Sequence, residues 1–155
     1  MTREEKCLLA ITKGFIYNKE TGKIFGPMGR ESKRVICGYY TLNLKIGSYN
    51  NAKQYNLKVH QLIWFIENNE VVDCIDHIDG NKFNNNINNL RSVSAQENRF
   101  NTKVKGYKFD KRSGKYEARI TLSGKYIHLG TFNNKEDASN AYLEAKKIYH
   151  IIKNN

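Results

Sequence analysis

The sequence predicts an α+β protein with three parts: a small N-terminal antiparallel sheet, a central strand–loop–strand–helix unit, and a C-terminal three-stranded antiparallel sheet packed on one helix. Two observations indicate this fold class. Aromatic and β-branched residues alternate with polar ones in residues 14–57 and again in 106–132, as in half-buried strands. Between and after these stretches, apolar residues recur at the spacing of amphipathic helices. The 155 residues suffice for one or two small domains, which we predict at 1–102 and 103–155.

Two segments predict the N-terminal sheet. In residues 14–26, two short β-prone runs flank a Thr-Gly turn, which is typical of a hairpin. In "YYTLNLKIG", alternation places four apolar side chains on one face: Tyr40, Leu42, Leu44 and Ile46. We therefore expect residues 14–57 to form one small antiparallel sheet.

A change of apolar period predicts a helix from about Lys58 to Asn68. Its apolar stripe consists of Val59, Leu62, Ile63 and Ile66. His60 lies beside this stripe. Since no acid or second histidine stands at metal-ligand spacing from His60, a packed or capping histidine is a better interpretation than a catalytic one.

The central unit is predicted as strand, loop, strand and helix. "VVDCIDH" is a short strand that ends near Asp76, and "GNKFNNN" is a loop, because Gly and Asn favour turns. "LRSV" is a second strand. Ser94 and Glu97 then form a capping box that begins a helix, and Asn98 falls on its first turn.

The C-terminal part is predicted from the strands "GYKFD", "KYEARITL" and "KYIHLGTF", joined by turns at "KRSG" and "SG". A final helix begins near Asn134, with Asp137 at the third helical position. Alternation along the middle strand separates an inward set from an outward one. The inward set, expected to meet the helix, is Tyr116, Ala118, Ile120 and Leu122.

The charge of the chain favours an anionic partner, because the formal net charge is +11. Residues 103–155 carry 12 Lys and Arg against 5 Asp and Glu, a net +7, so this part is the stronger electrostatic anchor. The alternative is a basic protein whose charge serves only solubility.

The chain has no apolar run of membrane-spanning length and no basic-then-apolar leader, so we expect a soluble, intracellular protein with no membrane partner. Its three cysteines are widely separated and contain no C-x-x-C pair. This argues against a disulfide framework or a zinc knuckle and predicts reduced thiols.

The segment "DCIDHIDGNKFNNNINNLRSVSAQEN" contains the groups that phosphodiester hydrolysis requires. His77 can accept a proton from water, because an unperturbed histidine has a pKa of about 6.5. Asp76 can bind a hard cation such as Mg²⁺, and Asn98 can add a neutral oxygen. Asn89 could bond the imidazole ring and set its tautomer.

This arrangement carries a geometric condition. In a regular strand, Asp76 and His77 point to opposite faces, so both reach one site only if the strand breaks there. Asp79 and Gly80, just beyond, favour such a break. Asp79 has a rival interpretation as a second acid of the site, but its position before Gly80 favours a role in the turn.

Residues 57–101, with "VHQLIWFI" followed by "DHIDGNKFNNNINNLRSVSAQEN", resemble the HNH homing endonucleases of phages and introns. The resemblance implies a ββα-metal unit in which His77 is the general base, Asp76 binds a single divalent metal ion and Asn89 orients the base. Asn98 stands where the family often has histidine, and the resemblance makes it the second metal ligand. An Asp/Asn oxygen pair suits Mg²⁺ or Mn²⁺ better than Zn²⁺ or Ni²⁺.

The C-terminal part, with "GKYEARI", "LGTF" and "EDASNAY", resembles the plant ethylene-response-factor (apetala-type) DNA-binding domain. That resemblance implies a three-stranded sheet in the DNA major groove with a helix behind it. Ser113 and His128 replace Trp-like positions, so the target sequence is not inherited. Arg119 is the best candidate to bind guanine, and the alternative is a domain that binds protein. The outward DNA-contact candidates are Lys108, Lys115, Glu117, Arg119, Thr121, Tyr126 and His128.

The leading hypothesis is a sequence-specific, divalent-metal-dependent HNH endonuclease that hydrolyses phosphodiester bonds of double-stranded DNA. We expect it to act in the cytoplasm of a bacterial host, encoded by a phage or intron, as a monomer or weak dimer. Two alternatives remain: a non-catalytic DNA-binding regulator that retains a nuclease fold, and an RNA-binding basic protein.

Overall fold

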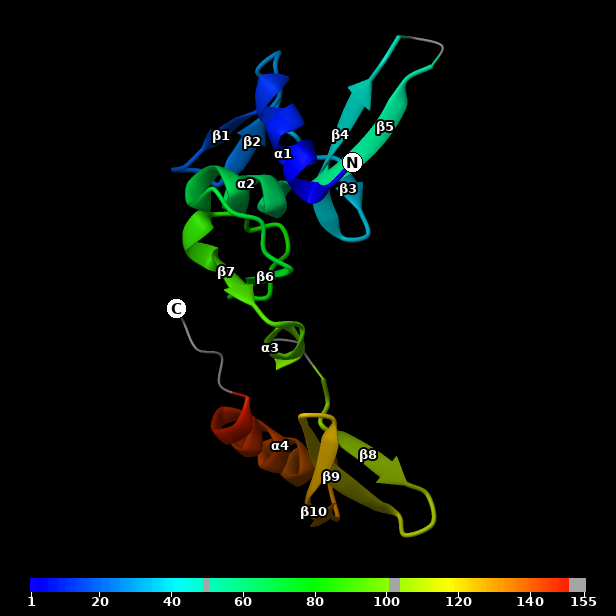
Figure 1. The fold of residues 1–155 in the computed structure, drawn as a ribbon. Coiled ribbons are helices and arrows are strands. Elements are labelled where there is room, and N and C mark those ends of the chain that lie inside the picture. The colour runs from blue at the N-terminus through cyan, green and yellow to red at the C-terminus, as the bar shows by residue number, and fades with distance from the viewer. Residues whose placement is uncertain (49–50, 101–103, 151–155) are drawn as a thin grey trace. The chain divides into compact units, whose positions relative to one another are not determined.

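The computed structural model describes residues 1–48, 51–100 and 104–150. Its contacts divide the chain into two compact units, Met1–Ser92 and Val93–Asn155 (Figure 1). Both units mix helices with small antiparallel sheets, as the predicted α+β class requires. The predicted domain boundary between residues 102 and 103 lies outside the described residues.

In its described residues, the first unit contains two α-helices, a short 3-10 helix and seven strands. In chain order these are α1 (Arg3–Thr12), β1 (Ile16–Asn18), β2 (Lys23–Phe25), β3 (Val35–Ile36), β4 (Tyr39–Ile46), β5 (Lys53–Lys58), α2 (Val59–Asn68), β6 (Cys74–His77), η1 (Ile87–Asn89) and β7 (Leu90–Val93). The strands form three sheets: the β1–β2 hairpin, β3–β4–β5, and the β6–β7 pair.

The predicted single sheet over residues 14–57 is wrong, because its strands belong to two separate sheets. The hairpin itself is confirmed, with Tyr17 opposite Ile24. After β2 the chain turns, with Gly26 and Arg30 bonded to each other through their backbones. The remaining strands then pair among themselves, Leu42 lying opposite Leu57.

Helix α1 was not predicted, although its signals are present in the sequence. Thr2 and Glu5 form a capping box: the Thr2 hydroxyl accepts from the Glu5 amide, and the Glu5 carboxylate accepts from the Thr2 amide. The helix places Cys7 and Ala10 completely out of solvent. Burial raises the pKa of the Cys7 thiol to about 11, which keeps it protonated and unreactive.

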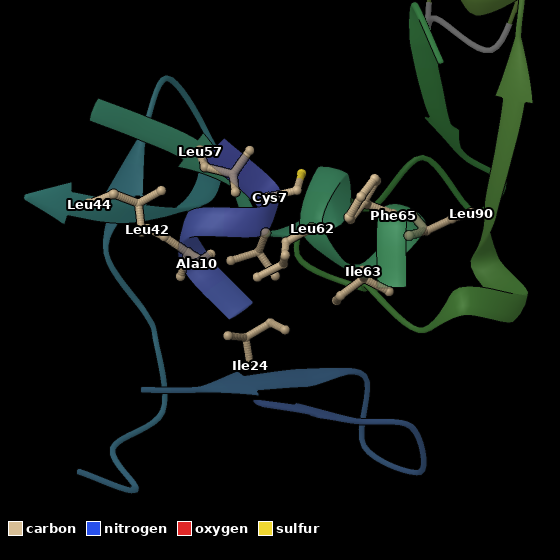
Figure 2. Packing of buried hydrophobic residues seen from close by; sticks show 11 residues of the cluster. Cys7, Ala10, Ile24, Leu42, Leu44, Leu57, Leu62, Ile63, Phe65 and Leu90 are labelled. Carbon is tan, nitrogen blue, oxygen red and sulfur yellow. The ribbon is translucent and has the colours of Figure 1, made fainter. Parts of the chain in front are cut away.

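The core of the first unit lies where α1 and α2 meet the β4–β5 hairpin and strand β2 (Figure 2). Ile24 comes from the β1–β2 hairpin, and Leu90 comes from β7. The largest completely buried apolar side chains are Ile24, Leu42, Leu44, Leu57, Leu62 and Ile63. Burying a side chain of this size contributes about 1.5–3 kcal/mol to the free energy of folding. Strand β5 and helix α2, which lead to the site described below, are therefore anchored in this core.

Helix α2 confirms the predicted span, but its buried face differs in one member. Val59, Leu62 and Ile63 are buried, whereas Ile66 is 36% exposed. His60 and Phe65 are buried instead. The helix ends at Asn69, whose left-handed backbone (φ 52°) is one that asparagine tolerates better than most residues.

The second unit contains α3 (Ala95–Phe100), β8 (Tyr107–Asp110), β9 (Lys115–Leu122), β10 (Lys125–Phe132) and α4 (Lys135–Tyr149). The three strands form an antiparallel sheet in the order β10–β9–β8, and α4 packs on it. Both predicted caps are confirmed, since Asn134 accepts from the Asp137 amide at 2.8 Å and Ser94 accepts from the Glu97 amide at 3.2 Å.

The sheet of the second unit confirms the predicted inward set in its two central members. Ala118 and Ile120 are buried, and Ile120 packs against Tyr142 and Ala145 of α4. Gly106 allows a close approach here, because a β-carbon at this position would lie 1.9 Å from the Tyr142 ring. Within the described ranges, no helix combines the length and apolar character needed to cross a membrane.

Candidate active site around Asp76 and His77

Strand β6 ends at the predicted acid–histidine pair. Asp76 and His77 are consecutive and both buried, with 6% and 4% of their surfaces exposed. The strand stops at this point, because the His77 carbonyl accepts from the Gly80 amide at 2.8 Å in a turn where Gly80 has φ 72°. The turn made by Gly80, in a conformation that L-residues disfavour, thus follows the pair, while Asp76 and His77 both lie within β6, so their convergence on one site stays a prediction.

The imidazole of His77 is held by Asn85, a residue that sequence reasoning missed. The His77 Nε2 lies 3.0 Å from the Asn85 Oδ1, and Asn85 is only 3% exposed. A carboxamide oxygen can only accept, so this contact favours a proton on Nε2. In that tautomer Nδ1 carries the lone pair that a general base needs.

Asn89, expected to bond the His77 ring, instead makes contacts that hold the loop together. Its side-chain nitrogen donates to Asp79 at 3.0 Å and to the Asn84 carbonyl at 2.8 Å, and its side-chain oxygen accepts from the Asp79 amide. The Asn89 carbonyl also accepts from the Ile78 amide. The contact with the His77 ring is therefore made by Asn85. Asn89 lies at the end of the loop, where its side-chain amide bonds to Asp79 at the start of the loop and to Asn84 within it.

Asp79 has the turn role that its position before Gly80 favours. Its carboxylate accepts from the Asn81 amide at 2.7 Å and from the side chains of Asn84 and Asn89. Desolvation opposes ionisation of this carboxyl, but the hydrogen bonds from Asn84, Asn81 and Asn89 together lower its pKa below the ordinary value. Asp79 is thus a structural anion within the loop.

The many asparagines of this loop mainly satisfy backbone amides. The side-chain oxygen of Asn81 accepts from the Phe83 amide at 3.1 Å, and that of Asn86 accepts from the Asn88 amide at 3.0 Å. Such contacts two residues ahead are Asx turns, which stabilise irregular backbone. The run is therefore explained by the loop's shape and supplies Asn85 as its buried member.

Asp76 pairs with Arg91 on the neighbouring strand β7. The Arg91 Nη2 lies 2.8 Å and its Nε 3.0 Å from the same carboxylate oxygen, Oδ2. Two charge-assisted hydrogen bonds from one guanidinium orient the Asp76 carboxylate. Arg91 was not predicted as a site residue, although it lies in the stretch "DHIDGNKFNNNINNLRSVSAQEN" that resembles HNH endonucleases.

Asp76 supplies a carboxylate oxygen, the kind of donor that hard cations prefer. Within residues 1–48, 51–100 and 104–150, no three His, Cys, Asp or Glu side chains come together as a metal cluster. Asn98 is exposed on α3 of the second unit, so its pairing with Asp76 stays a prediction.

A second histidine and a tyrosine surround the His77 ring. The ring centroids of His60 and His77 lie 5.1 Å apart at 90°, and that of Tyr39 lies 5.2 Å from His60 and 6.3 Å from His77. Burial first, and then the nearby His77, lowers the pKa of His60 to about 3. His60 is therefore neutral at physiological pH, which agrees with its interpretation as a packed histidine.

The predicted DNA-contact residues of the second unit occupy one face of its sheet. Six are exposed and Glu117 is half-buried. The strand register places His128 opposite Arg119 and Tyr126 opposite Thr121. The face is partly organised by its own contacts: the Arg119 guanidinium carbon lies 4.8 Å from the centroid of the Tyr126 ring, and the His128 Nδ1 lies 3.3 Å from the Glu117 carboxylate.

The chain is similar to known proteins in two comparisons. Residues 57–100 match the family described as HNH endonuclease. A protein of Acanthamoeba polyphaga mimivirus, named as an uncharacterized HNH endonuclease, is 33% identical over 118 residues, covering 74% of this chain and 32% of the relative. The chain thus spans about a third of that relative's length. No solved structure matches the chain significantly.

The matched stretch and the site coincide. Residues 57–100 begin at the end of β5 and run through α2, β6, the loop and β7 to the end of α3. They include Asp76 and His77 together with the two residues that hold them, Arg91 and Asn85. Residues 57–100 are therefore similar to HNH endonucleases over the whole of this site.

Proposed function

We propose that this protein is an endonuclease that hydrolyses phosphodiester bonds of double-stranded DNA with the help of one divalent metal ion, probed best as Mg²⁺. The observation that carries the proposal is the buried Asp76–His77 pair at the end of β6, with Asp76 oriented by Arg91 and His77 by Asn85. A buried, oriented carboxylate beside an oriented imidazole is costly to maintain for stability alone.

In the proposed reaction, His77 Nδ1 accepts a proton from the attacking water. Asn85 holds the Nε2 proton, so the ring stays in the tautomer that can act as a base, and it stabilises the imidazolium as it forms. The half-buried Tyr39 and the buried His60 pack against the same ring and limit its rotation. These residues position the base before the substrate arrives, which lowers the entropic part of the barrier.

Asp76 and Asn98 are the residues that would hold the metal ion. Arg91 fixes the direction of the Asp76 carboxylate from the neighbouring strand. The ion, when bound, neutralises charge on the phosphate and on the leaving oxygen. Mn²⁺ is expected to substitute for Mg²⁺, since both prefer oxygen ligands.

We further propose that the second unit binds DNA through the exposed face of its sheet and adds sequence specificity. Its residues 103–155 carry a net +7, which attracts the phosphate backbone. Stacking of Arg119 on Tyr126 reduces the freedom that the guanidinium would lose on binding a guanine edge. The face offers mainly charged side chains with one tyrosine, which favours duplex DNA over single-stranded RNA.

The biological setting of this activity is also a proposal. We expect a homing enzyme, encoded by a phage or an intron and acting in the bacterial cytoplasm, that cuts versions of its own locus lacking the reading frame. With one Asp76–His77 pair in the chain, a monomer is expected to nick one strand. A weak dimer, or two successive events, would break both strands.

Supercoiled plasmid carrying the DNA that flanks the reading frame tests the proposal. With Mg²⁺ the protein should convert it to nicked circles, and excess EDTA should stop the reaction. A plasmid with the same DNA interrupted by the reading frame is the matched control and should be cut more slowly. If DNA is bound but never cut with Mg²⁺ or Mn²⁺, the protein is instead a non-catalytic DNA-binding regulator.

A further inference from the structure

Two lysine side chains converge on one tyrosine beside the candidate active site. The Lys58 Nζ lies 4.3 Å and the Lys82 Nζ 4.7 Å from the centroid of the Tyr39 ring. The three residues come from different elements: Tyr39 begins β4, Lys58 ends β5, and Lys82 lies in the loop after β6. Three separate segments of the first unit therefore supply this group, which we call the Tyr39 cluster.

The Tyr39 cluster is directly connected to the proposed base. The Tyr39 ring packs against His60 at 5.2 Å and approaches His77 to 6.3 Å between centroids. Lys58 also immediately precedes the helix that carries His60. Tyr39 thus links the two ammonium groups to the His77 ring, the group that would activate the attacking water at the scissile phosphate.

Among the residues that the structure describes, no carboxylate lies within ion-pair distance of the two lysines of the Tyr39 cluster. Within the described residues, neither Lys58 nor Lys82 forms an ion pair, whereas Lys19 pairs with Glu67 at 2.6 Å in the same unit. Two cations drawn to one ring repel each other, and the attraction of each to the ring is worth only about 0.5–1 kcal/mol at exposed sites. An anion between or beside them would remove this repulsion.

We propose that Lys58 and Lys82 bind backbone phosphates of the DNA strand at His77, with the Tyr39 ring holding the two ammonium groups in place. Lysine is suited to this role because its ammonium is a compact point charge that contacts phosphate without reading sequence. The cluster would fix the register of the strand against the base. This inference rests on the proposed nuclease function but concerns binding, so binding is where it is tested.

The test uses protein carrying His77→Ala, which removes cleavage, and a short duplex of fixed sequence in EDTA. The dissociation constant is measured by fluorescence anisotropy at several salt concentrations. Removing one phosphate contact should reduce the slope of log K against log salt by about 0.9. We therefore expect Lys58→Gln and Lys82→Gln each to lower the slope by about that amount, and the double variant by about twice as much.

Matched controls are available in the same unit. Lys45 and Lys53 are exposed lysines of the β4–β5 hairpin, near its turn, where Lys53 pairs with Ile46. Changing Lys45 or Lys53 to glutamine removes the same charge and should leave the slope unchanged. Lys58→Arg and Lys82→Arg keep the charge and should retain the slope, which guards against an effect of misfolding.

Cleavage measurements separate failure of this inference from failure of the proposed function. With His77 intact, Lys58→Gln and Lys82→Gln should raise KM more than they lower kcat, because they remove binding to the substrate strand. Slopes equal to those of the Lys45 and Lys53 variants would overturn the phosphate role. That result can be obtained even if the unmodified protein cuts no DNA, since the salt experiment requires no cleavage.

Discussion

At the scale of residues, the candidate site depends on two side chains that hold the Asp76 carboxylate and the His77 ring in place. Asn85 contacts the His77 ring, and Arg91 contacts Asp76. Neither was predicted as a site residue. All asparagines of the run have the same side chain, so the sequence alone does not distinguish them. The path of the loop decides that Asn85 is buried and that Asn89 donates to the Asn84 carbonyl.

Replacing Asn85 tests this assignment. Asn85→Ala should lower kcat for nicking by about 10- to 100-fold, the range for groups that orient an imidazole, while DNA affinity changes little. Asn88→Ala, at an exposed position in the same run, is the matched control. Equal rates for the Asn85 and Asn88 variants would show that the ring contact has no catalytic role.

His60 gives a pH dependence whose sign can be worked out. Its pKa is lowered to about 3 in the folded protein, chiefly by burial, against about 6.5 when unfolded. Between these values the unfolded chain binds a proton that the folded chain does not. The contribution to stability is therefore complete above about pH 6.5 and is lost as the pH falls toward 3.

Urea denaturation of the first unit, followed by the fluorescence of its single tryptophan, Trp64, measures this effect. The His60→Phe variant keeps an aromatic ring and has no titrating group at this position. Between about pH 7 and pH 4 it should therefore lose less free energy of unfolding than the unmodified protein. Parallel pH profiles for the two proteins would contradict the burial argument.

At the scale of elements, the sequence predicted those strands and helices whose positions follow from local patterns such as the apolar period and the helix caps. The strand β7 matches the predicted "LRSV", and α2 and α4 begin where apolar period and caps place them. The single N-terminal sheet was wrong because alternation identifies strands but not their partners. Helix α1 was not predicted, although the sequence contains its capping box. Its buried face consists of Cys7 and Ala10, and the structure was needed to identify it.

The contact between Gly106 and α4 gives a prediction about the second unit. Gly106→Ala must place a β-carbon against the Tyr142 ring, in a backbone conformation (φ 72°) that alanine disfavours. It should destabilise the unit by more than about 2 kcal/mol, as strain and overpacking add.

Gly114→Ala is the matched control, since Gly114 has φ 67° and a β-carbon there would meet no atom within 4 Å. It should cost only about 1 kcal/mol, from backbone strain. Circular dichroism during urea denaturation measures both, while Trp64 fluorescence reports the first unit separately. Equal losses for the two variants would show that the approach of Gly106 to Tyr142 is not tight.

At the scale of the whole molecule, the chain joins a unit that contains the proposed base to a unit that carries much of its positive charge. The first contains Asp76 and His77. The second presents an exposed polar sheet face backed by α4. Such a division would let the second unit select a DNA site and raise the local concentration of substrate for a short catalytic contact.

Arg119 tests the proposed reader. Arg119→Ala should weaken binding to the target by about 1–3 kcal/mol and relax the preference at one base position, if the guanidinium binds guanine. Lys115→Ala, at an exposed position on the same strand, should weaken binding to all sequences alike. Binding measured against a set of single-base variants distinguishes the two, and a uniform loss for Arg119→Ala would assign it to phosphate.

The central claim is that the imidazole at the end of β6 takes a proton from water during DNA hydrolysis. The most direct measurement compares the single-turnover nicking rate and the DNA affinity of the unmodified protein with those of His77→Ala. We expect the rate to fall by at least about 100-fold while the dissociation constant is unchanged. A variant that nicks DNA as fast as the unmodified protein would remove His77 from the mechanism and contradict the account.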